Sequence, residues 1–237
     1  MKVIKLSKKG TTMNITKILE NSILTEEKKR AKEHKSSGKL SASMLGMPTQ
    51  WQILKHLGVK PTEFTIRTML VFKRGRDVED MLIASVREKH EVKDQVACKY
   101  RDCVGYLDML VDGNAIEIKS TNTMAYRHIL KENNAKKGHA LQAGLYGLAL
   151  DMKEFKVCYV NTDTYQTITF TYKTKDFKKE IDGIIDFYNE CIRKKKIPLY
   201  TAIERWNSLP NYQKYPDYAK LDKNELYTIA DELYSPK

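Results

Sequence analysis

Apolar and polar residues alternate most regularly over 104–120, and this alternation predicts a β-hairpin. Asp112-Gly113 divides the stretch into two β-rich runs and is a strong signal for a tight turn. A two-residue loop predicts that Asp108 pairs directly with Glu117, with Lys119 on the same face, whereas a three-residue loop would slip the register by one. The expected apolar face comprises Leu107, Met109, Val111, Ile116 and Ile118, and the polar face also carries Tyr106.

The polar face of this hairpin carries two carboxylates and a lysine, residue types that suit a divalent-metal site. Opposed side chains in an antiparallel pair have Cβ atoms roughly 4.5–5.5 Å apart, so Asp108 and Glu117 would repel each other unless something neutralises them. A divalent cation would do so, because Mg²⁺ takes carboxylate oxygens and usually keeps several waters. Lys119 would then point toward whatever the metal holds. Equally, the three residues can be the solvated face of an ordinary hairpin, with Lys119 balancing Glu117.

Helical periodicity precedes the hairpin. It predicts helices over about 14–34, from Ser41 or Ser43 to about 56, and over 65–88. Gly75 stands in the middle of the third helix at a cost of roughly 1 kcal/mol relative to Ala, which indicates close approach of a backbone or a ligand. Glu79 follows one turn later. The pattern by itself favours an exposed helix carboxylate beside Arg76.

The segment after the hairpin, 121–138, is polar, basic and without a clear element. It is either a solvated loop or a mobile segment whose lysines contact phosphates, the main source of nucleic-acid affinity. Those lysines are Lys131, Lys136 and Lys137.

A largely buried helix is predicted over 139–152. His139, Gln142 and Tyr146 share one of its faces because they stand at i, i+3 and i+7. Polar-tipped residues aligned on an otherwise apolar helix are candidate site residues, and the alternative is that they are hydrogen-bonded polar groups of a core.

The order of elements predicts the fold class. Further strands are expected over 96–100, 155–161 and 167–172, a helix over 175–195, and a tail of aromatic and helical character. Strands in the middle, with helices before, between and after them, favour a layered α/β or α+β fold over a helical bundle. We expect residues 1–39 to form a basic helical arm, either docked, touching DNA or solvated, and residues 40–237 to form one domain.

Composition and charge limit the classes of molecule that this chain is expected to bind. A formal net charge of +12 over 237 residues favours polyanionic partners, nucleic acid first. No run of 18 apolar residues and no secretory signal are present, which predicts a cytoplasmic protein without a membrane partner. The four cysteines lack C-x-x-C spacing, which argues against a zinc ribbon or a redox dithiol.

Three motifs occur in a specific order. G-Y-L-D at 105–108, E-I-K at 117–119 and Q-A-G-L-Y at 142–146 resemble the PD-(D/E)XK nuclease superfamily, and more narrowly its RecB-like branch. That branch includes phage recombination exonucleases and CRISPR-associated RecB-like nucleases, and carries G-x-x-D, E-x-K and then Q-x-x-x-Y. L-S-A-S-M-L at 40–45 and G-R-x-x-E at 75–79 resemble its opening serine motif and metal-binding helix. The resemblance spans roughly residues 40–170.

The resemblance implies a restriction-endonuclease-like core, a central mixed β-sheet flanked by helices. It implies that Mg²⁺ or Mn²⁺ is bound by Glu79, Asp108, Glu117 and the backbone carbonyl of Ile118. Lys119 would orient or deprotonate the attacking water, and a role as base requires a lowered pKa. Gln142 and Tyr146 would hold DNA or brace the metal ligands, with His139 a weaker candidate beside them.

Two departures from the iron–sulfur members of the branch matter. The metal-helix position that is often His in them is Glu79 here, so the metal sphere should be all carboxylate. Tyrosines stand where their C-terminal cysteines would be expected, so we expect no iron–sulfur cluster.

The expected function is a metal-dependent DNA exonuclease acting in recombination or DNA processing, with a phage as one source. Its partners would be DNA with free ends, a recombination partner such as a single-strand annealing protein, and further copies of the chain. The alternatives are a non-cleaving DNA-binding protein on the same fold and a structure- or sequence-specific endonuclease. Polarity and strandedness stay open.

Overall fold

The computed structural model describes residues 14–33, 38–199 and 215–235. The chain divides into two compact units, Met1–Ser36 with Phe64–Lys73 and Ser37–Glu63 with Arg74–Lys237. In the first unit, α1 (Ile15–Glu33) buries Ile23, whereas the other apolar residues of its predicted stripe are exposed. The first turns of α3 (Ile66–Arg87) complete this unit. Much of the predicted arm, 1–13 and 34–37, lies outside the described residues.

The second unit is built on a mixed sheet, as expected. Its order is β1-β3-β4-β5-β6, with β2 also paired to β3. The pairs β1–β3 and β4–β5 are parallel and the others are antiparallel. The strands are β1 (Leu40–Ser41), β2 (Val92–Tyr100), β3 (Cys103–Val111), β4 (Asn114–Thr121), β5 (Glu154–Asn161) and β6 (Thr167–Lys173).

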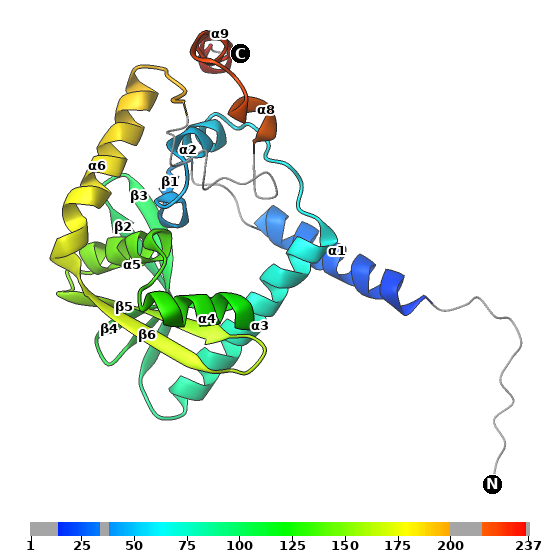
Figure 1. Cartoon of the computed structure of the whole chain (residues 1–237), viewed down its shortest axis with the longest axis vertical. Helices are drawn as coiled ribbons and strands as arrows, with labels where there is room; N and C mark the ends of the chain where they lie inside the picture. Colours follow the sequence, from blue (N-terminus) through cyan, green and yellow to red (C-terminus); the bar gives the residue numbers. More distant parts are fainter. Residues whose placement is uncertain (1–13, 34–37, 200–214, 236–237) are drawn as a thin grey trace, which may run out of the picture. The chain divides into compact units, whose positions relative to one another are not determined.

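Helices flank this sheet (Figure 1), and alternation along β5 sorts them into two layers. Phe155, Val157 and Tyr159 enter the larger core cluster with α5 and α6, whereas Cys158 and Val160 join a smaller cluster with α3. The helices of the second unit, besides the end of α3, are η1 (Ala42–Met44), α2 (Thr49–His56), α4 (Thr123–Glu132), α5 (Lys137–Ala149), α6 (Thr174–Arg193), α8 (Pro216–Ala219) and α9 (Lys223–Tyr234). Among the described helices, none combines the length and apolar character that crossing a bilayer requires.

The hairpin has the predicted register. Val111 pairs with Asn114 and Met109 with Ile116, which leaves Asp112-Gly113 as a two-residue loop. Both loop residues have positive φ, 45° and 76°, as a type I′ turn requires.

The predicted apolar face of the hairpin is wrong for one residue. Leu107 belongs to the larger cluster, whereas Met109, Val111, Ile116 and Ile118 lie in or against the smaller one. The alternation breaks because β2 and β3 pair on both sides of Gln95 and Asp108 but not at that position, where Gln95 has a φ of 47°.

Residues 123–132 form a helix, α4, that the expectation of a structureless basic segment missed. The Asn122 side chain caps it by accepting from the Ala125 N–H at 2.9 Å, and Asn133 ends it with a left-handed φ of 48°. Tyr126 and Ile129 form its buried face. The helix expected from Ser41 or Ser43 is likewise corrected, because β1, η1 and only then α2 occupy that stretch.

Candidate active site

β3 changes partners along one of its edges. β1 pairs with Cys103 and Val104, β4 pairs with 109–111, and residues 105–108 have no strand partner on that edge among the described residues. The Asp108 carboxylate fills this gap, because its Oδ2 accepts from the backbone N–H of Ile118 at 2.7 Å. The Asp108 side chain therefore accepts a hydrogen bond that the backbone of β3 would accept if the β3–β4 ladder continued. At this point β4 separates from β3 and remains paired with β5.

Glu117 is fully buried, at 0 % exposure. Its Oε1 accepts from Nζ of Lys119 at 2.5 Å. Its Oε2 is buried and, when the carboxyl group is ionised, has no hydrogen-bond partner among the described residues. Burial, reinforced by the neighbouring Asp108 and opposed by Lys119, raises the pKa of Glu117 to about 8. Burial likewise raises the pKa of Asp108.

Lys119 is held charged by its surroundings. Burial opposes its charge, but the carboxylates of Glu117, Asp108 and Glu79 outweigh burial and raise its pKa. A lysine that serves as a general base needs a lowered pKa. In the metal-free protein Lys119 is therefore a fixed positive charge beside the carboxylates.

Glu79 reaches the same group of charges from α3. Its pKa rises to about 7 because of burial and the nearby Asp108. Its Oε1 accepts from Nε2 of Gln95 at 3.1 Å. It is thus a half-buried carboxylate that faces the hairpin, and the exposed helix position that the sequence pattern favoured is wrong. One turn earlier, a Cβ at Gly75 would lie 2.8 Å from Oγ of Ser120 on β4, so the group that approaches this glycine is a side chain and not the expected backbone or ligand.

On α5, the side chains of Gln142 and Tyr146 are hydrogen-bonded to each other. Nε2 of Gln142 donates to Oη of Tyr146 at 3.2 Å, and the Tyr146 side chain is 2 % exposed. A Cβ at Gly105 would lie 2.7 Å from this hydroxyl and 2.8 Å from Cβ of Ala42. The glycine three residues before Asp108 thus lets α5 and η1 approach β3 closely. Burial and the charge of Glu117 raise the pKa of Tyr146.

His139 lies on the same side of α5 but is bonded elsewhere. Its Nδ1 is 2.9 Å from Oη of Tyr159, which also accepts the Lys136 N–H at 2.9 Å. Burial, with the charges of Lys119 and Lys136, lowers the pKa of His139 to about 3. The ring is therefore neutral at pH 7. Because the Tyr159 oxygen accepts the amide, its own proton is free to be donated to His139.

The three candidate phosphate contacts have different surroundings. Lys131 is exposed in the last turn of α4. Lys136 is exposed at the N-terminal cap of α5, close enough to act on His139. Lys137 pairs with Glu180 of α6 at 2.7 Å. Of the three, only Lys136 acts on His139, whose pKa the charge of Lys119 also lowers.

The structure resembles solved structures at low sequence identity. It superposes on the protein SSO0001 with a TM-score of 0.54 and 14% identity, over 89% of this chain and 99% of that chain. The two proteins share a fold. An alkaline exonuclease from Laribacter hongkongensis (TM-score 0.48, 15% identity, 66% of this chain, 91% of that chain) and a phage-related exonuclease from Haemophilus somnus 129PT (0.45, 14%, 66%, 96%) score too low to bear on fold or function.

No family model matches the chain, and no curated protein matches it.

The carboxylate oxygens of Glu79, Asp108 and Glu117 are suitable ligands for a hard divalent cation, but in their present positions they do not surround one ion. Within residues 14–33, 38–199 and 215–235, no three Asp, Glu, His or Cys side chains are already arranged around one ion. Glu79, Asp108 and Glu117 instead engage Gln95, the Ile118 amide and Lys119. Three carboxylates with raised pKa, one with a buried unpartnered oxygen, are what a dication would neutralise. Binding it requires Asp108 and Glu117 to exchange present partners for the ion, whereas Glu79 can keep Gln95 on Oε1 and offer Oε2.

Sequence reasoning missed Gln95. It lies on β2 across from Asp108, holds Glu79, and adopts a left-handed φ that is uncommon for a residue other than glycine. Nothing in the local sequence marks it, because its partner is 16 residues away on α3.

Proposed function

We propose that this chain is a metal-dependent DNA nuclease, and within that class an exonuclease. The observation that carries the proposal is the grouping of Glu79, Asp108 and Glu117 with Lys119 at the gap in β3, where burial raises every carboxyl pKa. A binding module would gain nothing from carboxylates that repel phosphate. The ordered motifs at 105–108, 117–119 and 142–146 support it.

The proposed ligands are the three carboxylates and the backbone carbonyl of Ile118. A Mg²⁺ or Mn²⁺ ion bound there would polarise the scissile phosphate and lower the pKa of a bound water. Lys119, positively charged and in contact with Glu117, would hold the phosphate and offset the negative charge that develops on it. Its raised pKa supports this electrostatic role over that of a base.

Two further groups of residues have roles in this proposal, one in bracing β3 and the other in contacting DNA. Tyr146 and Gln142 are proposed to brace β3 at Gly105, since the Tyr146 side chain is buried and its hydroxyl lies 2.7 Å from where a Cβ at Gly105 would be. Lys136 and Lys131 remain exposed, as contact with DNA phosphates requires. The chain's net charge of +12 favours association with such a polyanion.

The exonuclease assignment, and a role in recombination or DNA processing, rest on the Q-x-x-x-Y motif after E-x-K. An endonuclease and a non-cleaving binder are the alternatives. A closed circular substrate separates all three, because it is cut by an endonuclease, left intact by an exonuclease that needs ends, and only retarded in a gel by a binder.

The test uses end-labelled linear and closed circular DNA, single- and double-stranded, with Mg²⁺, Mn²⁺ or EDTA. Glu117→Gln removes a proposed ligand at nearly constant shape, and Glu154→Gln makes the same change at an exposed carboxylate of β5. We expect metal-dependent loss of linear DNA by the wild type and by Glu154→Gln, and at least a 100-fold lower rate for Glu117→Gln. DNA that is bound but never cleaved would refute the catalytic proposal.

A further inference from the structure

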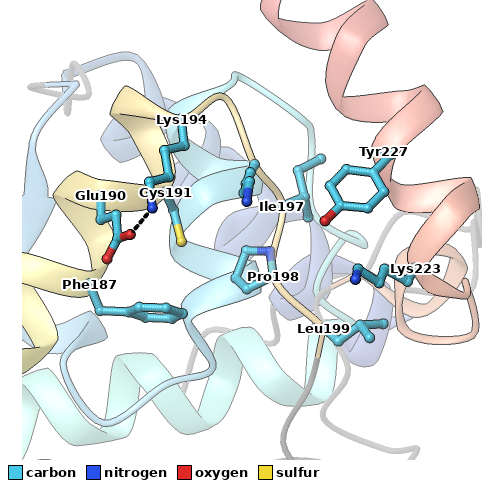
Figure 2. A pocket seen from close by; sticks show the side chains of 10 residues that line it. Phe187, Glu190, Cys191, Lys194, Ile197, Pro198, Leu199, Lys223 and Tyr227 are labelled. Carbon is cyan, nitrogen blue, oxygen red and sulfur yellow. Dashed lines mark hydrogen bonds and ion pairs between the residues drawn. The ribbon is translucent and has the colours of Figure 1, made fainter.

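A second candidate site lies where α6 ends. An open pocket of about 250 Å³ is lined by the last turns of α6, the segment 196–199 and the start of α9 (Figure 2). None of the carboxylates of the proposed active site lines it. It is therefore a separate feature of the second unit.

The walls of this pocket are fixed by buried interactions. Gln50 of α2 is 2 % exposed, and its Nε2 donates to the Pro198 carbonyl at 3.1 Å. The Lys196 N–H donates to the Cys191 carbonyl at 2.9 Å and so caps α6. On the other side, α9 is anchored by the buried Leu226. The pocket is thus part of the folded unit.

Apolar side chains stay exposed on three of its walls. Phe187 of α6 is 48 % exposed, Leu199 is 39 % exposed and Tyr227 of α9 is 41 % exposed. Phe187 and Tyr227 lie on opposite sides, with Pro198 between them (Figure 2). Large apolar residues that gather from separate segments mark an interaction site more often than single exposed ones do.

Lysines give the same pocket a positive rim. Lys194 pairs with Glu190, and Nζ of Lys223 lies 5.6 Å from the centre of the Tyr227 ring. Lys196 is exposed, and its charge acts on Glu190, whose ion pair is with Lys194. Three lysines against one glutamate leave an excess of positive charge beside two aromatic rings. Proteins that bind single-stranded nucleic acid combine these same elements, rings on which bases stack and cations that hold the backbone.

We propose that this pocket binds one nucleotide of a single-stranded DNA segment, with the base against Tyr227 or Phe187 and the phosphate at Lys196. Its volume is below the 300–1,000 Å³ usual for drug-sized ligands, so it suits a single base. The choice of DNA as ligand rests on the proposed function. The pocket would hold the strand at a distance from the bond that is cut.

The experiment measures binding of fluorescein-labelled oligo(dT) by anisotropy in EDTA, so that no cleavage occurs. Tyr227→Ala should weaken binding about tenfold, whereas Tyr227→Phe, which keeps the ring, should not. Lys196→Glu should weaken it more than Lys179→Glu, the same charge change at an exposed position of α6 outside the pocket. An abasic oligomer should bind wild type and Tyr227→Ala equally, because it offers no base to stack.

Two outcomes separate this inference from the proposed function. If wild type degrades DNA with Mg²⁺ but Tyr227→Ala and Lys196→Glu bind oligo(dT) as wild type does, the pocket is not a nucleotide site and the nuclease proposal stands. If binding depends on Tyr227 while no metal supports cleavage, the pocket inference stands and the nuclease proposal fails. Circular dichroism confirms that each variant is folded.

Discussion

Gln95 donates a hydrogen bond to Glu79 across 3.1 Å, from β2 to α3, and it does so from a left-handed backbone with a φ of 47°. That conformation costs a residue with a Cβ about 1–2 kcal/mol. The same position lies opposite Asp108, where the β2–β3 ladder is interrupted. Local strain and a contact to a proposed ligand therefore coincide, and we predict from this that Gln95 positions Glu79.

We expect Gln95→Ala to weaken Mn²⁺ binding about tenfold or more, since Glu79 loses the partner that orients it. Gln95→Gly should lose the same affinity but be more stable than Gln95→Ala by about 1 kcal/mol, because glycine tolerates positive φ. Calorimetric titration gives the affinities and urea denaturation gives the stabilities. Unchanged Mn²⁺ affinity in both variants would exclude the positioning role.

The metal-free protein should lose stability as the pH rises from 6.5 to 8. Glu117, with a folded pKa of about 8, and Glu79, with about 7, bind protons in this window that the unfolded chain, near 4.5, has released. The free energy of unfolding therefore falls with rising pH. Below about 6.5 the buried His139, whose pKa is lowered to about 3, contributes a slope of the opposite sign.

Glu117→Gln isolates the glutamate contribution. Glutamine cannot ionise, so the variant should be more stable than the wild type at pH 8 and lose that advantage toward pH 5. Urea denaturation in EDTA at several pH values measures this, and Glu154→Gln is the exposed control. Parallel stability curves for wild type and Glu117→Gln would contradict the raised pKa.

The hairpin could be predicted because its signals are local. Asp112-Gly113 sets a two-residue loop, and that loop alone brings Asp108 and Glu117 together. The position of Glu79 beside them depends on α3 packing across the sheet, which periodicity cannot specify. The motif order supplied that residue, and the charges of Asp108 and Lys119 both act on its pKa.

The parts that sequence reasoning missed depend on distant contacts. α4 has only Tyr126 and Ile129 as buried residues in a polar stretch, too few for a clear period, and its ends depend on the side chain of Asn122 and the left-handed Asn133. β1 is two residues long and exists because β4 leaves part of the β3 edge free. The break in alternation after Leu107 has no sequence signal of its own.

A divalent cation should stabilise the protein, and more at pH 8 than at pH 6. At ten times its Kd, Mn²⁺ adds about 1.4 kcal/mol to the free energy of unfolding. At pH 6 the ion must displace protons from Glu117 and Glu79, so its affinity should be at least tenfold lower. Thermal denaturation with Mn²⁺ and with EDTA tests this. An equal shift in Glu117→Gln would mean that the ion binds elsewhere.

Gly105 should be intolerant of even a methyl group, because a Cβ there meets the Tyr146 ring and hydroxyl and the Ala42 side chain at 2.7–2.9 Å. The ring is rigid and buried, so Gly105→Ala should cost about 1–3 kcal/mol and displace β3 next to Asp108, which would lower the proposed nuclease activity. Gly183 is the matched control: it lies inside α6 with nothing within 4 Å of its added Cβ. Gly183→Ala should therefore stabilise the protein by up to about 1 kcal/mol through helix propensity and leave activity unchanged. Urea denaturation with the linear-DNA assay distinguishes the two glycines, and equal stability changes would show that α5 does not constrain β3 at this position.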